Sequence, residues 1–336
     1  IVFGDWSSDV CSSDLVLSFI SSLANQTINC NSNTTFGAIT VNKPAPGFQT
    51  LTFLTNAKVT GSFILTADAA IVDISDRTMR FSGNLTPNNN TTFTTTNSTI
   101  YFDGTAVQTI RTNVGLTFNH VIFVNNGEKR VLSITDVPRH VFDVNGNFSI
   151  DGSTVDASNY GGQWGVDITV AGNWTNTGTF QHTGRTLTFD GADQIVGRTL
   201  TFVGLVFSGS GTKTLAGEIK AAGNLTIEDN ITLDVSASNY NISVGGSWNN
   251  GAANSQFIAR NGKVTFNGGG ITLTTGGDAV GKRFYNFTGN TTGNITMAGN
   301  LLVENNLEIE TGVLVTSTYN VTVGGNFDAT DRKSVV

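Results

Sequence analysis

Apolar and polar residues alternate with a period of two along most of the chain. In the segment NLTIEDNITLDV, residues 224–235, every apolar residue falls on an odd-numbered position. Such alternation predicts strands with one buried face, here two strands on either side of a short Asp-Asn turn. The segments KVTFNG at 263–268 and YNISV at 240–244 alternate in the same way. No segment carries apolar residues at helical spacing over three turns, so the sequence predicts an all-β protein.

Three sequence markers recur at a spacing near eighty residues. A phenylalanine precedes a short strand at four places, which are 82, 84 and 82 residues apart: Phe36, Phe118, Phe202 and Phe284. A Gly-polar-apolar motif recurs as a second marker at Gly61, Gly146, Gly223 and Gly299, and as a third at Gly83, Gly172, Gly246 and Gly325. The markers keep their order, which predicts three and a half repeats that start near residues 36, 118, 202 and 284. Tyr160, Tyr240 and Tyr319 are interpreted as equivalent, with six residues including Trp164 inserted after the first.

Two architectures are compatible with many short strands. Tandem β-sandwiches would need about seven strands and a separate core in every copy, with linkers between the copies. A parallel β-helix instead stacks coil upon coil, so that each coil pairs with the ones above and below. Turn residues recur every twenty to thirty residues and no linker separates the repeats. We therefore predict a right-handed parallel β-helix, a β-solenoid with roughly three coils per repeat, and keep tandem β-sandwiches as the alternative.

The Gly-polar-apolar motif is interpreted as a corner between strands. Glycine adopts a positive φ without steric cost, and Asn or Ser beside it can bond the neighbouring backbone. The next residue is large and apolar in each copy of the third marker: Leu85, Trp174, Trp248 and Phe327. We expect these four side chains to fill the core, where burial contributes about 1.5–3 kcal/mol each.

Both ends of the chain resemble translated nucleotide sequence. DWSSDVCSSDL at 5–15 matches one reading frame of a common sequencing adapter, and DRKSVV at 331–336 matches adapter sequence likewise. We therefore expect 1–15 and 331–336 to be artefact, 16–32 to be the remnant of a preceding segment, and 33–330 to be a single solenoid. Within that remnant, VLSFISSLA at 16–24 is interpreted as the end of a preceding strand, with the apolar part of a signal peptide as the alternative. The native chain is then expected to be an internal fragment of a longer protein.

Charge and cysteine content narrow the functional classes. The chain holds 18 basic and 25 acidic residues, a net charge of −7; without the two terminal segments the counts are 16 and 21, a net charge of −5. This mild acidity disfavours nucleic acid and anionic membranes as partners. Setting Cys11 aside leaves Cys30 alone, so we expect no internal disulfide. No apolar run is long enough for a transmembrane helix.

The densest group of charged residues is a candidate catalytic site. It consists of Glu128, Lys129, Arg130, Asp136, Arg139 and His140. Glycan lyases and hydrolases need a base or paired carboxylates in one groove, and Asp143 or Asp151 could supply a further carboxylate. The corresponding loops of the other repeats, at 42–47, 209–213 and 289–294, differ freely, which is typical of solvated turns. We therefore expect no catalytic residue and no enzyme activity.

Other chemistry has weak support in the sequence. His120, His140 and His182 have no cysteine or carboxylate at ligand spacing, so we expect no metal site and no cofactor. VGLVFSGSGTK at 203–213 is rich in glycine but lacks the spacing of a phosphate-binding loop. Threonines at 91–96 and 186–189 could build a hydroxyl face for glycan or ice, although threonine is common on the outward face of any strand.

GNWTNTGTF at 172–180, LTFDG at 187–191 and GNLTIEDN at 223–230 together resemble the large bacterial β-strand-repeat surface proteins, which are akin to haemagglutinin-type adhesins. The resemblance covers residues 33 to about 330. It implies an exported, extracellular protein that projects from the cell surface as a β-helical stalk, with no catalytic residues. The expected partners are surface glycans or proteins of host or neighbouring cells. Two alternatives stay open: a β-helix polysaccharide lyase or glycoside hydrolase, and a threonine-face binder of glycan or ice.

Overall fold

Short strands that pair almost entirely in parallel build the described chain. The computed structural model describes residues 15–19, 25–31, 34–42, 49–66, 71–88, 91–112, 116–133, 140–198 and 203–330. These residues form no helix, and their strands stack into a solenoid of about 13 turns. The predicted β-solenoid is therefore confirmed, while the hand of the coil stays a prediction. The chain divides into two compact units: unit 1 (Ile1–Thr169 and Asn176–Gln181) and unit 2 (Val170–Thr175 and His182–Val336).

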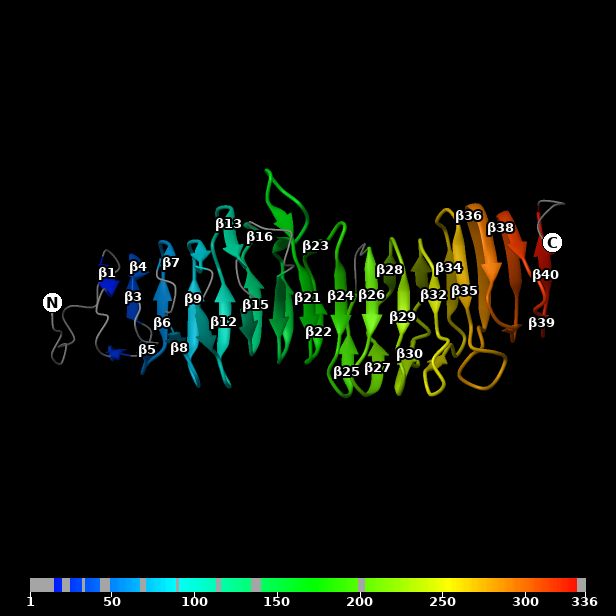
Figure 1. Cartoon of the computed structure of the whole chain (residues 1–336), viewed down its shortest axis with the longest axis horizontal. Helices are drawn as coiled ribbons and strands as arrows, with labels where there is room; N and C mark the ends of the chain where they lie inside the picture. Colours follow the sequence, from blue (N-terminus) through cyan, green and yellow to red (C-terminus); the bar gives the residue numbers. More distant parts are fainter. Residues whose placement is uncertain are drawn as a thin grey trace. The chain divides into compact units, whose positions relative to one another are not determined.

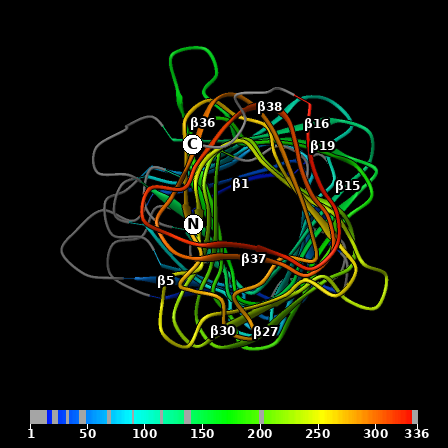
Figure 2. The same cartoon turned by 90° about the vertical axis from the view of Figure 1, so that its right-hand side faces the viewer.

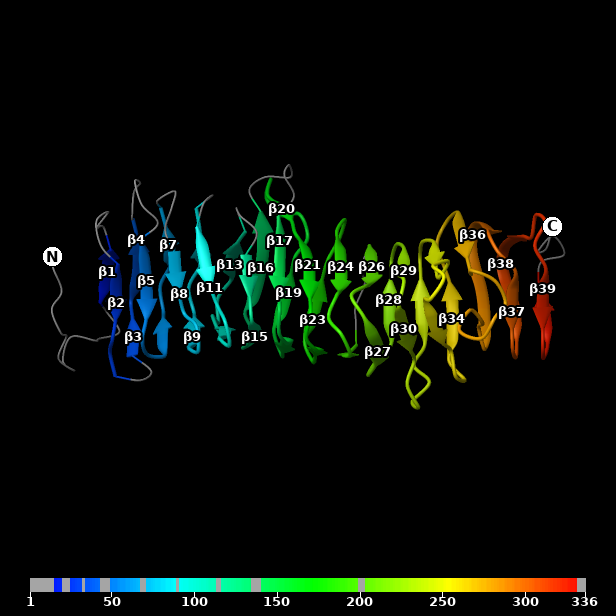
Figure 3. The same cartoon turned by 60° about the horizontal axis from the view of Figure 1, so that its bottom comes forward.

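Each coil of unit 1 has three strands, one on each of three faces. The first face holds β1 (Val16–Phe19), β4 (Ala38–Val41), β7 (Phe63–Leu65), β10 (Leu85–Thr86), β13 (Gln108–Arg111), β16 (Glu128–Ser133), β19 (Thr154–Asp156) and β23 (Thr179–Gln181). The second face, which Figure 1 shows strand after strand, holds β3 (Thr34–Phe36), β6 (Ala57–Val59), β9 (Thr78–Phe81), β12 (Thr99–Phe102), β15 (His120–Val124) and β18 (Phe148–Asp151). The third face holds β2 (Gln26–Ile28), β5 (Thr50–Phe53), β8 (Ile71–Asp73) and β11 (Thr92–Thr94), followed by β14 (Leu116–Phe118), β17 (Val141–Val144) and β21 (Asp167–Val170) (Figure 3).

Unit 2 repeats the three-faced plan. One face holds β22 (Trp174–Asn176), β25 (Gln194–Val196), β27 (Gly211–Leu215), β30 (Ile231–Asp234) and β33 (Gln256–Ile258), and β37 (Leu301–Val303) pairs with β39 (Val321–Val323) in a sheet of their own. The second holds β24 (Thr186–Phe189), β26 (Gly204–Phe207), β29 (Leu225–Ile227), β32 (Trp248–Asn249) and β35 (Ile271–Thr274). The third holds β28 (Ile219–Ala221), β31 (Ile242–Val244) and β34 (Lys263–Phe266). The long strands β36 (Asn286–Met297) and β38 (Leu307–Val315) run round a corner from one face to another, and β40 (Phe327–Ala329) pairs with β38.

The predicted alternation decides which side chains enter the core. In residues 224–235 the apolar residues at odd positions are all buried, from Leu225 to Val235. The two strands of this segment, β29 and β30, lie on different faces, with Asn230 between them at a φ of 60°. The Asp-Asn turn is therefore a corner of the coil. Viewed end-on, the backbone surrounds an interior that these inward side chains fill (Figure 2).

Aromatic side chains stack from coil to coil inside unit 1. Phe81, Phe102 and Phe123 occupy matching positions on β9, β12 and β15. Their ring centroids are 5.9 Å and 5.2 Å apart, and both pairs are stacked. Contacts of this kind add about 0.5–1.5 kcal/mol to the burial of each ring. Regular in-register pairing thus brings identical residues into contact although they are 21 residues apart in the chain.

Three of the four predicted core residues are confirmed. Leu85 and Trp174 are 0% exposed and Trp248 is 1% exposed. Phe327 was predicted to be buried, and this is wrong, since half of it is exposed. It lies on β40, which pairs with β38 on one side and with no other strand among the described residues. A residue at this position is covered only where a further coil stacks on it.

The motif glycines are needed for a different reason from the one expected. Gly61 and Gly83 do not have a positive φ, so the prediction of left-handed corners is wrong for them. A Cβ atom on Gly83 would overlap the carbonyl of Gly61, and one on Gly61 would overlap the carbonyl of Gly37. The glycines therefore stack on one another, and each allows the next coil's backbone to approach closely.

The asparagine beside the glycine bonds the backbone of the next coil. The amide N–H of Thr109 donates to Oδ1 of Asn84 at 2.8 Å, and that of Ser247 donates to Oδ1 of Asn224 at 2.8 Å. The bonded residues are 25 and 23 residues apart. The predicted hydrogen bond from the asparagine side chain to the backbone is thus confirmed. Its partner is the backbone of the next coil, so the bond joins neighbouring coils at a corner.

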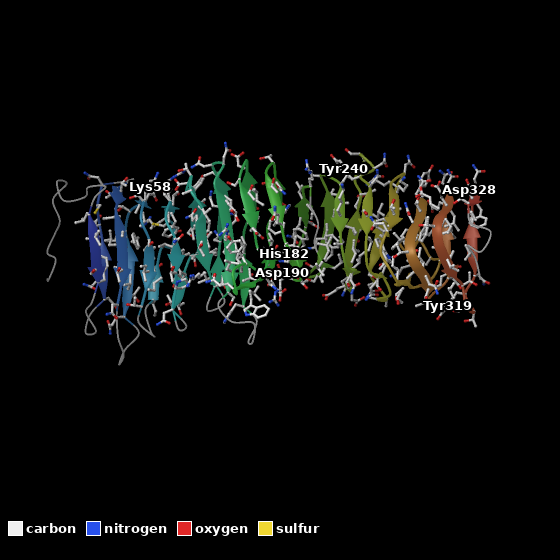
Figure 4. All side chains as sticks on the ribbon, turned by 90° about the horizontal axis from the view of Figure 1, so that it is seen from above. Lys58, His182, Asp190, Tyr240, Tyr319 and Asp328 are labelled. Carbon is white, nitrogen blue, oxygen red and sulfur yellow. The ribbon has the colours of Figure 1, made fainter. Side chains whose placement is uncertain are left out.

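The repeat near eighty residues is not confirmed. Leu85 of the third marker pairs with Phe63 of the second, and Trp248 pairs with Leu225 in the same way. The two markers are therefore one corner on successive coils, and the structural repeat is the single coil. The strands that follow Tyr240 and Tyr319 belong to different sheets: β31 lies between β28 and β34, whereas β39 pairs with β37 in a sheet of two strands. These two tyrosines, which lie at opposite edges of unit 2 in Figure 4, are accordingly not equivalent.

The beginning of the described chain already belongs to the coils. β1 pairs in register with β4, and β2 pairs with β5. The strand predicted within 16–24 is confirmed by β1. Cys30 is disulfide-bonded, so the expectation that it stands alone is wrong. Of the segments interpreted as adapter sequence, 1–15 and 331–336, all residues except Leu15 lie outside the described residues.

Candidate functional site

The predicted charged cluster divides between the inside and the outside of β16. Glu128 and Arg130 point outward, and Arg130 donates to both carboxylate oxygens of Glu128 at 2.7 Å and 3.0 Å. Lys129 points inward and is 0% exposed. Its Nζ donates to the carbonyls of Gly104 at 2.7 Å and Gly127 at 2.9 Å. Lys129 therefore closes a corner of the coil and is not available to a ligand on the surface.

Of the other members of the cluster, the structure describes only His140. Asp136 and Arg139 lie outside the described residues. His140 precedes β17, where burial lowers its pKa. Asp143 on β17 and Asp151 on β18 accept hydrogen bonds from Thr117 at 3.2 Å and Thr177 at 3.3 Å. Since β16, β17 and β18 belong to three different faces, these carboxylates do not share a groove with Glu128.

A hairpin beside β16 is the most distinctive local feature of unit 1. The chain leaves β19 at Asp156 and returns as β20 (Trp164–Gly165), which pairs antiparallel with Leu132 and Ser133 of β16. Figure 1 and Figure 2 show this segment as the green loop that projects outward. Two backbone hydrogen bonds between Tyr160 and Gln163, at 3.0 Å and 2.9 Å, close its tip. The predicted insertion around Trp164 is therefore this hairpin.

The sequence of the hairpin accounts for its shape. Gly161 and Gly162 have φ values of 57° and 77°, and two consecutive left-handed residues give the type I′ turn that matches the twist of paired strands. Oδ1 of Asn159 accepts from the N–H of Gly165 at 2.8 Å and ties the two arms together. Leu132 has the same outward parity as Arg130 but is only 2% exposed, and it pairs with Gly165 of β20. The hairpin is thus anchored on the wall of the coil.

The hairpin carries two exposed aromatic side chains. Tyr160 is 48% exposed and Trp164 is 39% exposed. The guanidinium carbon of Arg130 lies 3.6 Å from the centroid of the Tyr160 ring, a cation–π contact worth about 0.5–1 kcal/mol at an exposed position. Glu128 in turn holds Arg130 through its two hydrogen bonds. Arg130 therefore positions Tyr160, and the cluster and the insertion meet at one place.

The sequence analysis singled out Arg130 and Tyr160 but did not predict that they are in contact. Arg130 and Tyr160 are thirty positions apart and belong to features that were interpreted separately. The signal was present in Tyr-Gly-Gly-Gln, since two glycines between strand residues predict a hairpin. The register of β16 on β19, where Arg130 faces Asp156, is what brings the cluster to the base of that hairpin.

A second charged cluster lies on the second face of unit 1. Asp103 accepts from Arg80 at 2.9 Å and from the hydroxyl of Ser82 at 2.6 Å, and Nζ of Lys58 lies 3.5 Å away. Arg80 also lies over the ring of Tyr101, 4.4 Å from its centroid. Burial alone would raise the pKa of Asp103, but these hydrogen bonds and positive charges outweigh it and lower the pKa. The charged and polar groups of this cluster are hydrogen-bonded or ion-paired with one another, so the cluster stabilises the coil.

The threonine segments do not form continuous rows. On β11, Thr92 and Thr94 follow Ile71 and Asp73 of the preceding coil. Thr188 of β24 is followed by Val206 of β26. No group of three or more His, Cys, Asp or Glu side chains within the described ranges could hold a metal ion. Nor do those ranges contain a helix long and apolar enough to cross a membrane.

Comparison with known proteins adds no family. No family model, no curated protein and no solved structure matches the chain. The fold and the geometry above therefore carry the functional argument.

Proposed function

We propose that the chain is a structural and adhesive stalk segment of a secreted or cell-surface bacterial repeat protein, and that it has no catalytic activity. The observation that carries the proposal is the coil-to-coil pairing of parallel strands within each unit. Each coil donates and accepts backbone hydrogen bonds with its neighbours, and solenoids built in this way supply length and stiffness from short repeated units.

The distribution of charge supports a non-catalytic role. Glycosidic cleavage needs two carboxyl groups on one site, about 5–10 Å apart. Around the cluster predicted from sequence, the described carboxylates of Glu128, Asp143 and Asp151 lie on three different faces. Lys129, another member of that cluster, is enclosed in the core.

The first test concerns location. Intact cells that produce the native protein are treated briefly with a protease, and released peptides are identified by mass spectrometry. We expect peptides from this segment in the released fraction, while a cytoplasmic marker protein stays in the cells. Release of the segment only after lysis would contradict a surface location.

The second test concerns catalysis. The full 336-residue chain is incubated with neutral and acidic polysaccharides, and new reducing ends and unsaturated uronates are measured. We expect no product above the buffer control. Product that disappears in a Glu128→Gln or Asp143→Asn variant would overturn the non-catalytic assignment and support a lyase or hydrolase.

A further inference from the structure

We infer that Lys58, Arg80 and Tyr101 form a binding site for the negatively charged groups of acidic glycans, namely uronate carboxylates or sulfate esters. The three residues occupy matching outward positions on β6, β9 and β12 of unit 1 and are called the basic row. They therefore lie side by side on one face of one sheet. The inference rests on the proposed adhesive function and names its ligand class and its place.

Two positive groups of the basic row converge on a single carboxylate oxygen. Nε of Arg80 lies 2.9 Å and Nζ of Lys58 lies 3.5 Å from Oδ2 of Asp103. The side chain of Asp103 is 3% exposed, whereas the side chains of Lys58 and Arg80 are 37% and 40% exposed. One buried negative charge therefore holds two positive charges close together at the surface, and a second negative charge from a ligand would balance them.

Both positive groups keep hydrogen-bond donors for a ligand. Arg80 bonds Asp103 through Nε, and its two terminal amino groups have no hydrogen-bond partner among the described residues. Lys58 has its single ionic contact with Asp103, which leaves ammonium N–H groups for other acceptors. Hydrogen bonds from a guanidinium fork and an ammonium group to carboxylate or sulfate oxygens are charge-assisted, and they are stronger than bonds between neutral groups.

The direction of the Arg80 side chain is fixed before a ligand binds. Its guanidinium carbon lies 4.4 Å from the centroid of the Tyr101 ring, and its Nε is tied to Asp103. Asp103 is held in turn by the hydroxyl of Ser82, which donates at 2.6 Å. A side chain that is already ordered loses little conformational freedom on binding, so more of the contact energy appears as affinity.

The strands around the basic row carry no competing negative charge. With histidine counted as neutral, Lys58 and Arg80 are the only charged residues within β3, β6, β9, β12 and β15. At the corner before β9, Asp76 and Arg77 carry opposite charges. Since the whole chain has a net charge of −7, the basic row is a local positive area on an acidic protein.

The surroundings of the basic row fit a sugar better than a nucleic acid or a membrane. Thr78 and Thr99 are paired on β9 and β12, in the row next to Arg80 and Tyr101. Their hydroxyls and the phenol of Tyr101 offer donors and acceptors to sugar hydroxyls. Nucleic acids and anionic membranes are bound through many basic residues, and this face has only two. A saccharide with a single acidic group can instead use the cations and the hydroxyls together.

The test is a glycan array probed with the full chain, with uronate-containing, sulfated and neutral oligosaccharides. We expect binding to acidic glycans, and the first two classes separate carboxylate from sulfate recognition. Binding should weaken when NaCl is raised from about 0.05 M to about 0.5 M, because salt screens exposed charges. Lys58→Gln leaves Arg80 on Asp103 and should weaken binding about tenfold, the effect of losing one charge-assisted contact.

The matched control is Lys220→Gln, which removes an exposed lysine from β28 of unit 2 and should bind as the wild type does. Arg80→Lys keeps the positive charge but loses the paired donors, so it should also bind at least about tenfold more weakly. Wild-type affinity in Arg80→Lys would contradict the role of the guanidinium fork. Far-ultraviolet circular dichroism and the melting temperature confirm that each variant is folded.

Three further outcomes would overturn the inference. Acidic glycans that bind equally well to the wild type and Lys58→Gln would place adhesion elsewhere and leave the proposed function standing. A preference for neutral glycans, or tighter binding to phosphatidylserine vesicles than to any glycan, would refute the ligand class. If no glycan binds but the protease experiment still finds the segment on the cell surface, the stalk role stands and the basic row fails as a binding site.

Discussion

Gln108 and Lys129 are paired on adjacent coils of unit 1. Their side chains hydrogen-bond the backbone N–H and the backbone carbonyl of the same residue, Gly104. The N–H of Gly104 donates to Oε1 of Gln108 at 3.2 Å, and Nζ of Lys129 donates to the carbonyl of Gly104 at 2.7 Å. Unit 2 contains the same arrangement, in which Gln194 and Lys213 bond the N–H and the carbonyl of Gly191. Both lysines are 0% exposed. Buried ammonium groups therefore hold corner carbonyls that have turned inward.

Replacing Lys129 by methionine should destabilise the protein. Methionine has a similar length but cannot donate to the carbonyls of Gly104 and Gly127, which stay buried. An unsatisfied buried polar group costs about 1–3 kcal/mol, and we expect the free energy of unfolding in urea to fall by that amount. The control is Lys220→Met on β28, where the lysine is exposed. Equal stability of the two variants would contradict a structural role for Lys129.

The stability of the protein should depend on Lys213 in alkaline solution. Burial lowers the pKa of Lys213 from 10.5 to about 8, although Asp190 and Asp193 act in the opposite direction. Between about pH 8 and pH 10.5 the Lys213 amine is protonated in the unfolded chain and neutral in the folded protein. Unfolding therefore takes up a proton, and a lower pH favours it in this range. The contribution of this residue to the free energy of unfolding should accordingly rise with pH over this window, by about 3 kcal/mol at most.

Urea unfolding at a series of pH values, for the wild type and for Lys213→Met, measures this contribution. The difference between the two proteins should change across the window and stay constant below about pH 8, the pKa of Lys213 in the folded protein. Lys220→Met serves again as the control, because Lys220 is exposed on β28. Parallel pH profiles for the wild type and Lys213→Met would refute the prediction.

Gly83→Ala should be costly although its backbone is not left-handed. The added methyl group would overlap the carbonyl of Gly61, so the coils must separate locally. Overpacking of this kind costs about 1–3 kcal/mol, which thermal unfolding can detect. Gly269→Ala is the matched control, since no atom lies within 4 Å of its added Cβ. A neutral effect of Gly83→Ala would mean that the corner yields without strain.

Asp103→Asn should weaken the protein at neutral pH and matter less in acid. The pKa of Asp103 is lowered below its usual 3.8 despite burial, because Ser82 and Arg80 bond the carboxylate and Lys58 and Arg80 add positive charge. Its contribution is fully present above the unfolded pKa and is lost as the pH falls through the folded pKa. We expect a loss of about 1–3 kcal/mol at pH 7, and a smaller difference from the wild type at the lowest pH. A difference that is independent of pH would show that the ionised carboxylate is not what stabilises the fold.

The sequence predicted the features that follow from local patterns, namely which residues of a strand are buried and which large residues enter the core. Alternation assigned the buried residues of β29 and β30, and the large residues after glycine identified Leu85, Trp174 and Trp248 as core. It did not predict the coil as the repeat, because similar corners occur on successive coils and fit a longer spacing equally well. Phe63 and Leu85, which were assigned to different markers, are neighbours at one corner.

The candidate site shows the limit of sequence reasoning most clearly. The alternation of side chains along a strand predicts that Lys129 points to the face opposite to Glu128 and Arg130. The sequence does not indicate that the lysine is buried there. Its enclosure depends on the carbonyls of Gly104 and Gly127, which only the folded corner turns inward. The contact of Arg130 with Tyr160 likewise requires the register between strands that are more than twenty residues apart.

The hairpin after Asp156 leaves the coil beneath it unchanged. Asp156 pairs with Arg130 on one side and with Gln181 on the other, in the same register as the residues before it. A corner can therefore accept additional chain while the strands next to it keep their partners, since each strand is fixed by the coils above and below. Such a scaffold can gain, lose or exchange surface loops one corner at a time, and new recognition can evolve, or be engineered, without redesign of the core.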